Sequence, residues 1–220
     1  IMLSEHHTIR KASAQAPLPL LFSPAAVYFT KRGEYMQRFS IIVGDITKSN
    51  AEAIVNAANT TLLGGSGVDG AIHAAAGPRL LEECRTLGGC ETGQAKITTG
   101  YNLPAKYVLH TPGPIWQGGG HGEAALLASC YRSCLSLAAQ KGIRSVDFPS
   151  ISTGVYGYPI HQAVTVALRA IMDFLSSHDL PQQVRMVCHT EAAADVYRQV
   201  WNLWFAESHD GRLDVSHQKR

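Results

Sequence analysis

Apolar and polar positions alternate with two different periods along the middle of the chain. Short apolar runs are typical of buried strands, and they span residues 38–43, 53–57, 94–98, 106–111, 144–149 and 184–188. Longer segments with apolar residues three or four apart predict amphipathic helices, and they span residues 69–76, 78–86, 123–140, 160–177 and 191–205. Because these helices alternate with short apolar strands, the pattern predicts an α/β fold with three α/β/α layers and a mostly buried sheet.

The two ends of the chain lack this periodicity. Residues 1–35 contain three prolines, and Met36 begins a stretch that runs directly into the first predicted strand. We therefore expect residues 36–205 to form the folded domain, and residues 1–35 to be a flexible N-terminal extension or a misassigned start. Residues 206–220 are polar and are expected to form a loose C-terminal tail.

Composition narrows the class of protein. Hydrophobic residues make up 45% of the 220 residues and charged residues 16%, which is typical of a folded globular chain. No apolar run reaches the roughly 18–20 residues that a membrane span needs, and no secretory signal pattern is present. Five cysteines in a chain too large to depend on disulfides favour reduced thiols. We therefore expect a cytoplasmic protein that does not act in a membrane.

The charge of the predicted domain is balanced. The whole chain has a net charge of +2, but residues 36–205 carry twelve Lys or Arg and twelve Asp or Glu residues. Sequence-independent binding of nucleic acid normally depends on a basic face that neutralises phosphates. A neutral domain gives no support for a nucleic-acid partner.

The stretch NAANTTLLGGSGVDGAIHAAAG at residues 56–77 is the first candidate site. Asn56 ends a predicted strand and Asn59 follows it, and amide side chains suit sugar hydroxyls because they both donate and accept hydrogen bonds. Asp69 is either a general base that positions water or only the first-turn acid of the following helix. The GSGVDG segment at 65–70 matches a dinucleotide pattern, but it lies eight residues after the strand and lacks the expected acidic residue further on. This argues against a dinucleotide site of the Rossmann type.

Two more loops follow predicted strands. SISTGVYGYP at 150–159 offers small side chains and exposed N–H groups that can surround a phosphate, whereas Tyr156 either stacks on a ligand or covers the core edge. GDIT at 44–47 places Asp45 after the first strand, where it either accepts a hydrogen bond from a base or caps a turn, and the second interpretation is favoured. Three such loops at the carboxyl ends of strands predict a ligand with phosphate and ribose groups.

Together these segments resemble the macrodomain family, in its MacroD-type branch. The matching text is GDIT (44–47), AIVNAAN (53–59), LLGGSGVDGAIHAAAG (62–77), GCETGQAKITTGYNLPAKYVLHTPGP (89–114) and FPSISTGVYGYP (148–159). The similarity is greatest to short bacterial members that remove acyl groups from O-acetyl-ADP-ribose and ADP-ribose from modified proteins. The resemblance implies an α/β/α sandwich around a mixed, largely parallel sheet, with ADP-ribose in a cleft at its edge.

The resemblance also implies a role for each matching residue. Asp45 would hold the adenine amine and Ile46 its ring, whereas Asn59 would bind the distal ribose and Asp69 would orient or activate the attacking water, with Asn56 supporting them. The residues that would contact the diphosphate and the distal ribose are Gly65, Gly67, Val68, Ser152, Thr153, Gly154, Val155 and Tyr156.

Ser66 occupies a position where the family generally has glycine, close to the expected reaction site. Its side chain would narrow that site, or it would form a hydrogen bond to the water or phosphate. We therefore group Ser66 with Asn59 and Asp69 as candidate catalytic residues. His189 stands after the last predicted strand, where the resemblance places the adenine.

The expected function is hydrolysis of an ester between the distal ribose and an acidic side chain or acetate, without metal or cofactor. Its partners would be ADP-ribose, O-acetyl-ADP-ribose and mono-ADP-ribosylated proteins. Cys130 and Cys134 share a helix face and are interpreted as core residues, and His73 and His110 as structural ones. Two alternatives stay open: a non-catalytic ADP-ribose reader, and a regulatory partner of an RNA-processing enzyme.

Overall fold

The computed structural model describes residues 36–205, and the predicted segments 1–35 and 206–220 lie outside the described residues. The strands are β1 (Phe39–Val43), β2 (Ala53–Ala58), β3 (Lys96–Thr99), β4 (Tyr107–Pro112), β5 (Ser145–Phe148) and β6 (Gln183–Cys188). The helices are the short 3-10 helix η1 (Ile46–Lys48), α2 (Gly67–Ala76), α3 (Pro78–Thr86), α4 (Glu123–Gln140), α5 (Ile160–Ser177) and α6 (Glu191–Phe205). The hydrophobic pattern therefore predicts each long element to within a few residues, whereas it misses η1.

The strands form one mixed sheet with the order β1-β6-β5-β2-β4-β3. Neighbouring strands are parallel from β1 through to β4, and β3 at the edge pairs with β4 in the antiparallel direction. The expected mixed, largely parallel sheet is thus confirmed. Because parallel strands end at one edge, the loops after β1, β2, β5 and β6 lie close together.

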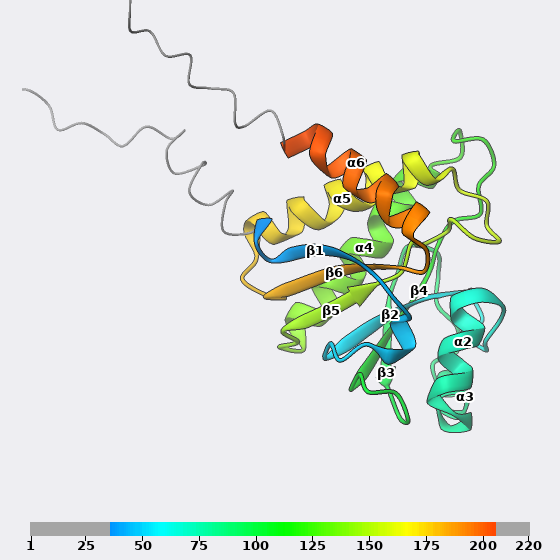
Figure 1. Ribbon diagram of the computed structural model, residues 1–220. Helices are drawn as coiled ribbons and strands as arrows, with labels where there is room; N and C mark the ends of the chain where they lie inside the picture. Colours follow the sequence, from blue (N-terminus) through cyan, green and yellow to red (C-terminus); the bar gives the residue numbers. More distant parts are fainter. Residues whose placement is uncertain (1–35, 206–220) are drawn as a thin grey trace, which may run out of the picture.

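Helices cover both faces of this sheet, with α2 and α3 on one face and α4, α5 and α6 on the other (Figure 1). Alternate strand residues point to opposite faces. Ile54 and Val108 therefore pack in the core under α2 and α3, whereas Val55 and Leu109 pack in the larger core under α4 and α5. This arrangement confirms the three-layer α/β/α fold.

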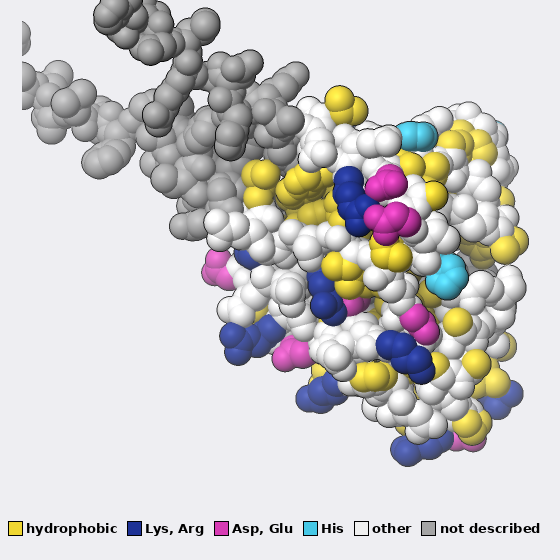
Figure 2. Space-filling model, viewed as in Figure 1, with side chains coloured by type: hydrophobic (Ala, Val, Ile, Leu, Met, Phe, Trp, Pro, Cys, Tyr) yellow, Lys and Arg dark blue, Asp and Glu magenta, His cyan; other side chains and the backbone are white. Residues whose placement is uncertain are grey.

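Within the described part of the chain, no helix is long and apolar enough to cross a membrane. On the face of the molecule seen in Figure 2, basic and acidic side chains are interspersed over the surface. No continuous basic patch forms on that face, in keeping with the balanced charge of residues 36–205.

Candidate functional site

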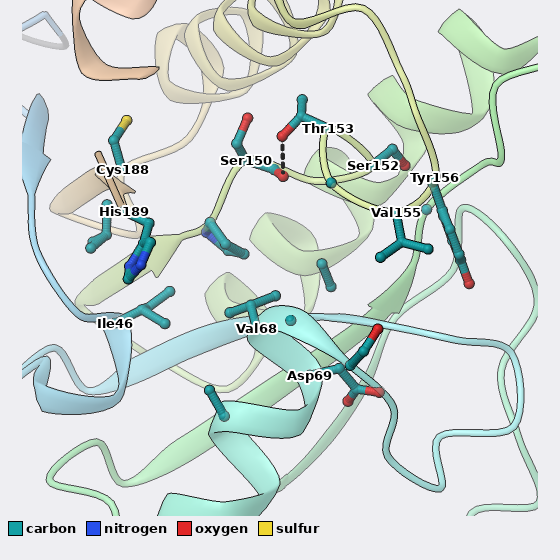
Figure 3. A pocket seen from close by; sticks show the side chains of 18 of the residues that line it. Ile46, Val68, Asp69, Ser150, Ser152, Thr153, Val155, Tyr156, Cys188 and His189 are labelled. Atoms are coloured by element: carbon teal, nitrogen blue, oxygen red, sulfur yellow. Dashed lines mark hydrogen bonds between the residues drawn. The ribbon is translucent and has the colours of Figure 1, made fainter. Parts of the chain in front are cut away.

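A cleft of about 760 Å³ opens at the carboxyl ends of the parallel strands (Figure 3). Its walls come from η1, the loop between β2 and α2, the loop after β5 and the segment after β6. The residues predicted from the sequence that line it are Asp45, Ile46, Asn59, Gly65, Ser66, Gly67, Val68, Asp69, Ser152, Thr153, Gly154, Val155 and Tyr156. The fold thus brings together three loops that lie far apart in the sequence.

Asn56 is the exception among the predicted ligand-binding residues. Its side chain is fully buried and does not line the cleft, because it lies on β2 beneath α2. Its Nδ2 atom donates a hydrogen bond to Asp69 Oδ1 at 2.7 Å. In the structure, Asn56 thus contacts Asp69 and does not line the cleft.

Asp45 caps the 3-10 helix η1 at one end of the cleft. Its Oδ1 atom accepts hydrogen bonds from the Thr47 hydroxyl at 2.7 Å and from the Thr47 backbone N–H at 2.9 Å. These two bonds, the side-chain bond foremost, lower the pKa of Asp45. The interpretation as a cap is confirmed, and since both bonds end on Oδ1, Oδ2 can still accept a hydrogen bond from a ligand.

Asn59 shapes the glycine-rich loop that follows β2. Its Oδ1 atom accepts hydrogen bonds from the Thr61 N–H at 3.0 Å and the Thr61 hydroxyl at 2.6 Å, and its Nδ2 atom donates to the Gly64 carbonyl at 2.8 Å. A Cβ atom at Gly65 would lie only 2.9 Å from Asp69 Oδ2. Glycine therefore allows the backbone of residue 65 to lie directly against the Asp69 carboxylate.

Ser66 stands on this loop as the N-cap residue of α2, and its side chain forms no capping hydrogen bond. Its φ of −105° and ψ of 175° are an extended conformation that any residue adopts. The left-handed positions are Gly64 and Gly67 on either side, with φ of 85° and 62°. A serine at position 66 thus costs no backbone strain, and its exposed hydroxyl lines the cleft.

Asp69 lies in the first turn of α2 at the floor of the cleft and is only 3% exposed. Burial raises its pKa, whereas the hydrogen bond from Asn56 and the nearby His73 oppose this rise. His73 Nε2 lies 3.5 Å from Asp69 Oδ1, so this histidine, interpreted from sequence as structural, also acts on the carboxylate. A buried carboxylate with a raised pKa is a good candidate for a general base.

The loop after β5 forms the wall opposite Asp69 (Figure 3). Ser152 adopts the left-handed conformation with φ of 66°, and its buried Oγ atom has no hydrogen-bond partner in the described part of the chain. Backbone hydrogen bonds from Tyr158 to Ser152, and from Gly157 to Gly154, hold the turn. These bonds hold the backbone of the loop in one conformation, which reduces the cost of ordering it when a ligand binds.

The structure separates the two interpretations of Tyr156. The side chain that covers the core is Tyr158, which is 3% exposed and packs against Trp116 with a ring distance of 4.5 Å. Tyr156 instead lines the cleft and is partly exposed. Its carbonyl accepts a hydrogen bond from the Trp116 N–H at 2.9 Å, which joins the β5 loop to the loop after β4.

Glu123 organises that neighbouring loop. It is 1% exposed, and its carboxylate accepts hydrogen bonds from the backbone N–H groups of Gln117, Gly119 and His121 at 2.7–3.0 Å. Hydrogen bonds from backbone N–H groups, its own first among them, lower the pKa of Glu123 to about 2. The carboxylate thus fixes the segment that carries Trp116 and, through Trp116, supports Tyr156.

Sequence reasoning missed several residues that line the cleft, among them Gly113, Ser150, Cys188 and Thr190. Gly113 directly follows β4, and this position at a strand end is the signal that could have identified it. His189 faces Ile46 across the cleft (Figure 3). The histidine therefore lies opposite Ile46, the residue to which the resemblance assigns the adenine ring.

A histidine and cysteine cluster lies behind the cleft. The ligand atoms of His73, Cys84 and His110 lie within 4.8 Å of one another. However, His110 Nε2 lies 2.8 Å from the Thr98 hydroxyl, and burial lowers the pKa of His110 to about 3. The His110 ring is thus neutral and already bonded within the protein.

The two helical cysteines have a simpler environment. Cys130 and Cys134 are fully buried in the core under α4, as expected.

Comparisons with known proteins agree with this geometry. A family model described as Macro domain matches residues 55–167. A Macro domain-containing protein of Methanosarcina mazei is 57% identical over 71% of this chain and 83% of its own length. An O-acetyl-ADP-ribose deacetylase of Salmonella typhimurium is 53% identical over 74% of this chain and 93% of its own length.

Solved structures show the same fold. A mutant macrodomain of Oceanobacillus iheyensis with ADPR has a TM-score of 0.73 and 46% identity, covering 76% of this chain and 92% of its own. A Trypanosoma brucei macrodomain in complex with ADP-ribose has a TM-score of 0.72 and 44% identity, covering 76% of this chain and 71% of its own.

Proposed function

Because the chain belongs to the Macro domain family, we propose that it binds ADP-ribose in the cleft and hydrolyses acyl esters of the distal ribose. O-acetyl-ADP-ribose is the proposed small substrate, and proteins that carry ADP-ribose on an acidic side chain are the proposed larger ones. The names of the Salmonella relatives support deacetylation, and the relatives solved with ADP-ribose support the ligand.

The observation that carries this proposal is the place of Asp69 in the cleft. A buried carboxylate with a raised pKa lies at the cleft floor, opposite the loop that contains Ser152 and Tyr156. If the backbone N–H groups of that loop hold the diphosphate, the distal ribose reaches the Asp69 end of the cleft. The acyl group and the carboxylate would then be neighbours.

The chemistry requires one water molecule and one proton acceptor. Asp69 would take a proton from the water while the water oxygen attacks the acyl carbonyl, and the ribose oxygen would leave with a proton. The products are ADP-ribose and the free acid. Holding the water in place can supply several kcal/mol of barrier reduction, and general-base help contributes about 10²–10⁴-fold.

Protein substrates are proposed because residues with small side chains form the rim of the cleft beside Asp69. Gly65, Ser66 and Gly67 are exposed along the rim, next to the Asp69 carboxylate. This rim would leave room for a glutamate or aspartate side chain of a modified protein.

The second candidate function, a reader that binds ADP-ribose without turnover, is favoured by Ser66. Its hydroxyl occupies the cleft wall at a position where the resemblance expects glycine. If this hydroxyl displaces the attacking water, Ser66→Gly would raise turnover; if it holds the water, Ser66→Gly would lower it.

The decisive experiment compares the wild type with Asp69→Asn. The introduced amide would keep an oxygen for the Asn56 hydrogen bond but lose the base, so acetate release from O-acetyl-ADP-ribose should fall by about 10²–10⁴-fold. The thermal midpoint should not fall, because burial raises the pKa of Asp69 and therefore disfavours its ionised form in the folded state.

Calorimetry with ADP-ribose separates the two candidate functions. Binding without release of acetate, or of ADP-ribose from a glutamate-modified protein, would identify a reader. Full activity of Asp69→Asn would remove Asp69 from the mechanism.

A further inference from the structure

A continuous chain of polar side chains runs from the cleft floor into the interior. It consists of Asp69 on α2, Asn56 on β2, His110 on β4 and Thr98 on β3, and each residue is at most 3% exposed. Asn56 and His110 are direct neighbours in the parallel β2–β4 register. The alternation of the two strands places both side chains on the face covered by α2.

The directions of the hydrogen bonds among these four side chains follow from the protons that the Asn56 amide and the neutral His110 ring carry. Asn56 Nδ2 lies 2.7 Å from Asp69 Oδ1 and 3.1 Å from His110 Nδ1, so each of its two protons serves one acceptor. His110 Nδ1 must then be unprotonated, and the single ring proton of the neutral histidine resides on Nε2. From there it is donated to the Thr98 hydroxyl at 2.8 Å.

The orientation of the Asn56 amide depends on these two acceptors. The Asn56 Oδ1 atom is buried and has no hydrogen-bond partner within residues 36–205, so nothing on that side orients the amide. A reversed amide would place its oxygen against Asp69 Oδ1, and an ionised carboxylate cannot donate a hydrogen bond to it. His110 therefore fixes one of the two directions in which Asn56 donates.

We infer that His110 is a positioning residue that holds Asn56 and, through Asn56, directs the Asp69 carboxylate into the cleft. Asn56 occupies Asp69 Oδ1, which leaves Oδ2 beside the bare backbone of Gly65 at the cleft wall. Thr98 forms a hydrogen bond with the opposite ring nitrogen, Nε2, and so holds the His110 ring with Nδ1 toward Asn56. The effect of His110 on catalysis rests on the proposed function, whereas its effect on the position of Asp69 does not.

Loss of the His110 acceptor would loosen the hydrogen bond from Asn56 to Asp69, which favours the charged form of Asp69. The other titratable groups near this carboxylate are His73 on α2, at 3.5 Å, and Cys84 on α3. Cys84 Sγ also lies 3.8 Å from His110 Nε2. His73 Nε2 faces the same Asp69 Oδ1 atom as Asn56, whereas the Cys84 thiol contacts His110.

Three substitutions separate positioning from simple packing. His110→Leu introduces an apolar side chain of similar volume, which offers no acceptor for the Asn56 amide. His110→Asn places its Oδ1 atom at the position of Nδ1 and restores the acceptor. Thr98→Val removes the acceptor of the ring proton while nearly preserving shape, and it serves as an independent variant should His110→Leu fail to fold.

The primary measurement is the pKa of Asp69 from NMR titration of protein labelled with ¹³C at aspartate carboxyl groups. The signal that is missing in Asp69→Asn identifies Asp69. We expect His110→Leu to raise this pKa by about one unit, Thr98→Val to raise it by less, and His110→Asn to return it close to the wild-type value. Equal Asp69 titration in the wild type, His110→Leu and Thr98→Val would overturn the inference, and so would His110→Asn behaving like His110→Leu.

A kinetic measurement then relates positioning to catalysis. We expect His110→Leu to lower kcat for O-acetyl-ADP-ribose by about tenfold with little change in KM, because the ligand contacts are untouched. The acidic limb of the pH profile of kcat for His110→Leu should move to higher pH together with the pKa of Asp69. A wild-type protein that releases no acetate would refute the proposed function, whereas the NMR titration would still decide the role of His110.

Discussion

Gly113 provides a direct test of whether the β5 loop must keep its position to bind the ligand. A Cβ atom added to Gly113 would lie 2.2 Å from Ser152 Oγ and 2.7 Å from Ile151 Cγ2. The Ser152 hydroxyl could rotate away, but the fully buried Ile151 could not. Gly113→Ala should therefore push the whole loop outward by roughly 1 Å, a displacement that can cost about a hundredfold in function.

The energetic cost has two parts. Forcing a methyl group into a packed site destabilises a protein by about 1–3 kcal/mol. Hydrogen bonds to a charged group contribute about 1.5–3 kcal/mol each, so the loss of one N–H contact to the diphosphate would weaken binding by about 10–100-fold. Both effects should appear together in Gly113→Ala.

The assay is calorimetric titration with ADP-ribose combined with a thermal melt. Gly120→Ala is the matched control, because a Cβ atom at Gly120 would meet nothing within 4 Å and this residue has no left-handed φ. We expect the affinity of Gly120→Ala to stay within about twofold of the wild type. Wild-type affinity and melting temperature in Gly113→Ala would refute the view that Gly113 sets the position of the loop.

Two further predictions concern the carboxylates at the edges of the site. Asp45→Asn should weaken ADP-ribose binding in calorimetry and lower the thermal midpoint less than Asp45→Ala does, since an amide oxygen can still cap Thr47 whereas the amide nitrogen cannot accept from an adenine amine. Asp45→Ala should lose both the cap on Thr47 and the contact with adenine, at a stability cost of about 0.5–2 kcal/mol. Equal affinity for ADP-ribose in the two variants and the wild type would contradict the adenine assignment. For Glu123, the folded pKa of about 2 lies below the ordinary 4.5, so its stabilisation is fully present above pH 4.5 and is lost as the pH falls toward 2. The difference in urea midpoint between the wild type and Glu123→Gln should therefore shrink over that range, and a constant difference would show that the loop hydrogen bonds do not depend on the charge.

The sequence determined the fold of this protein because its hydrophobic periods are local. The runs at 53–57 and 106–111 correspond to β2 and β4, and the periodic segment at 160–177 coincides with α5. Asp45 and the loop at 150–159 were found for a similar reason, since polar residues directly after parallel apolar strands lie at one edge of the sheet, whereas Asp69 was found from its place at the start of a helix and from the family resemblance. Strand order, by contrast, has no local signal.

Only the tertiary structure decided what each polar residue touches. The sequence interpreted Asn56 both as an amide suited to sugar hydroxyls and as a support for the site, and the pairing of β2 with β4 buries it between Asp69 and His110. The sequence also left open whether Tyr156 stacks on a ligand or covers the core edge; in the structure Tyr158 packs on Trp116 in the core, whereas Tyr156 lines the cleft. Hydrogen-bond partners, burial and pKa values depend on contacts between residues far apart along the chain, and the fold alone creates those contacts.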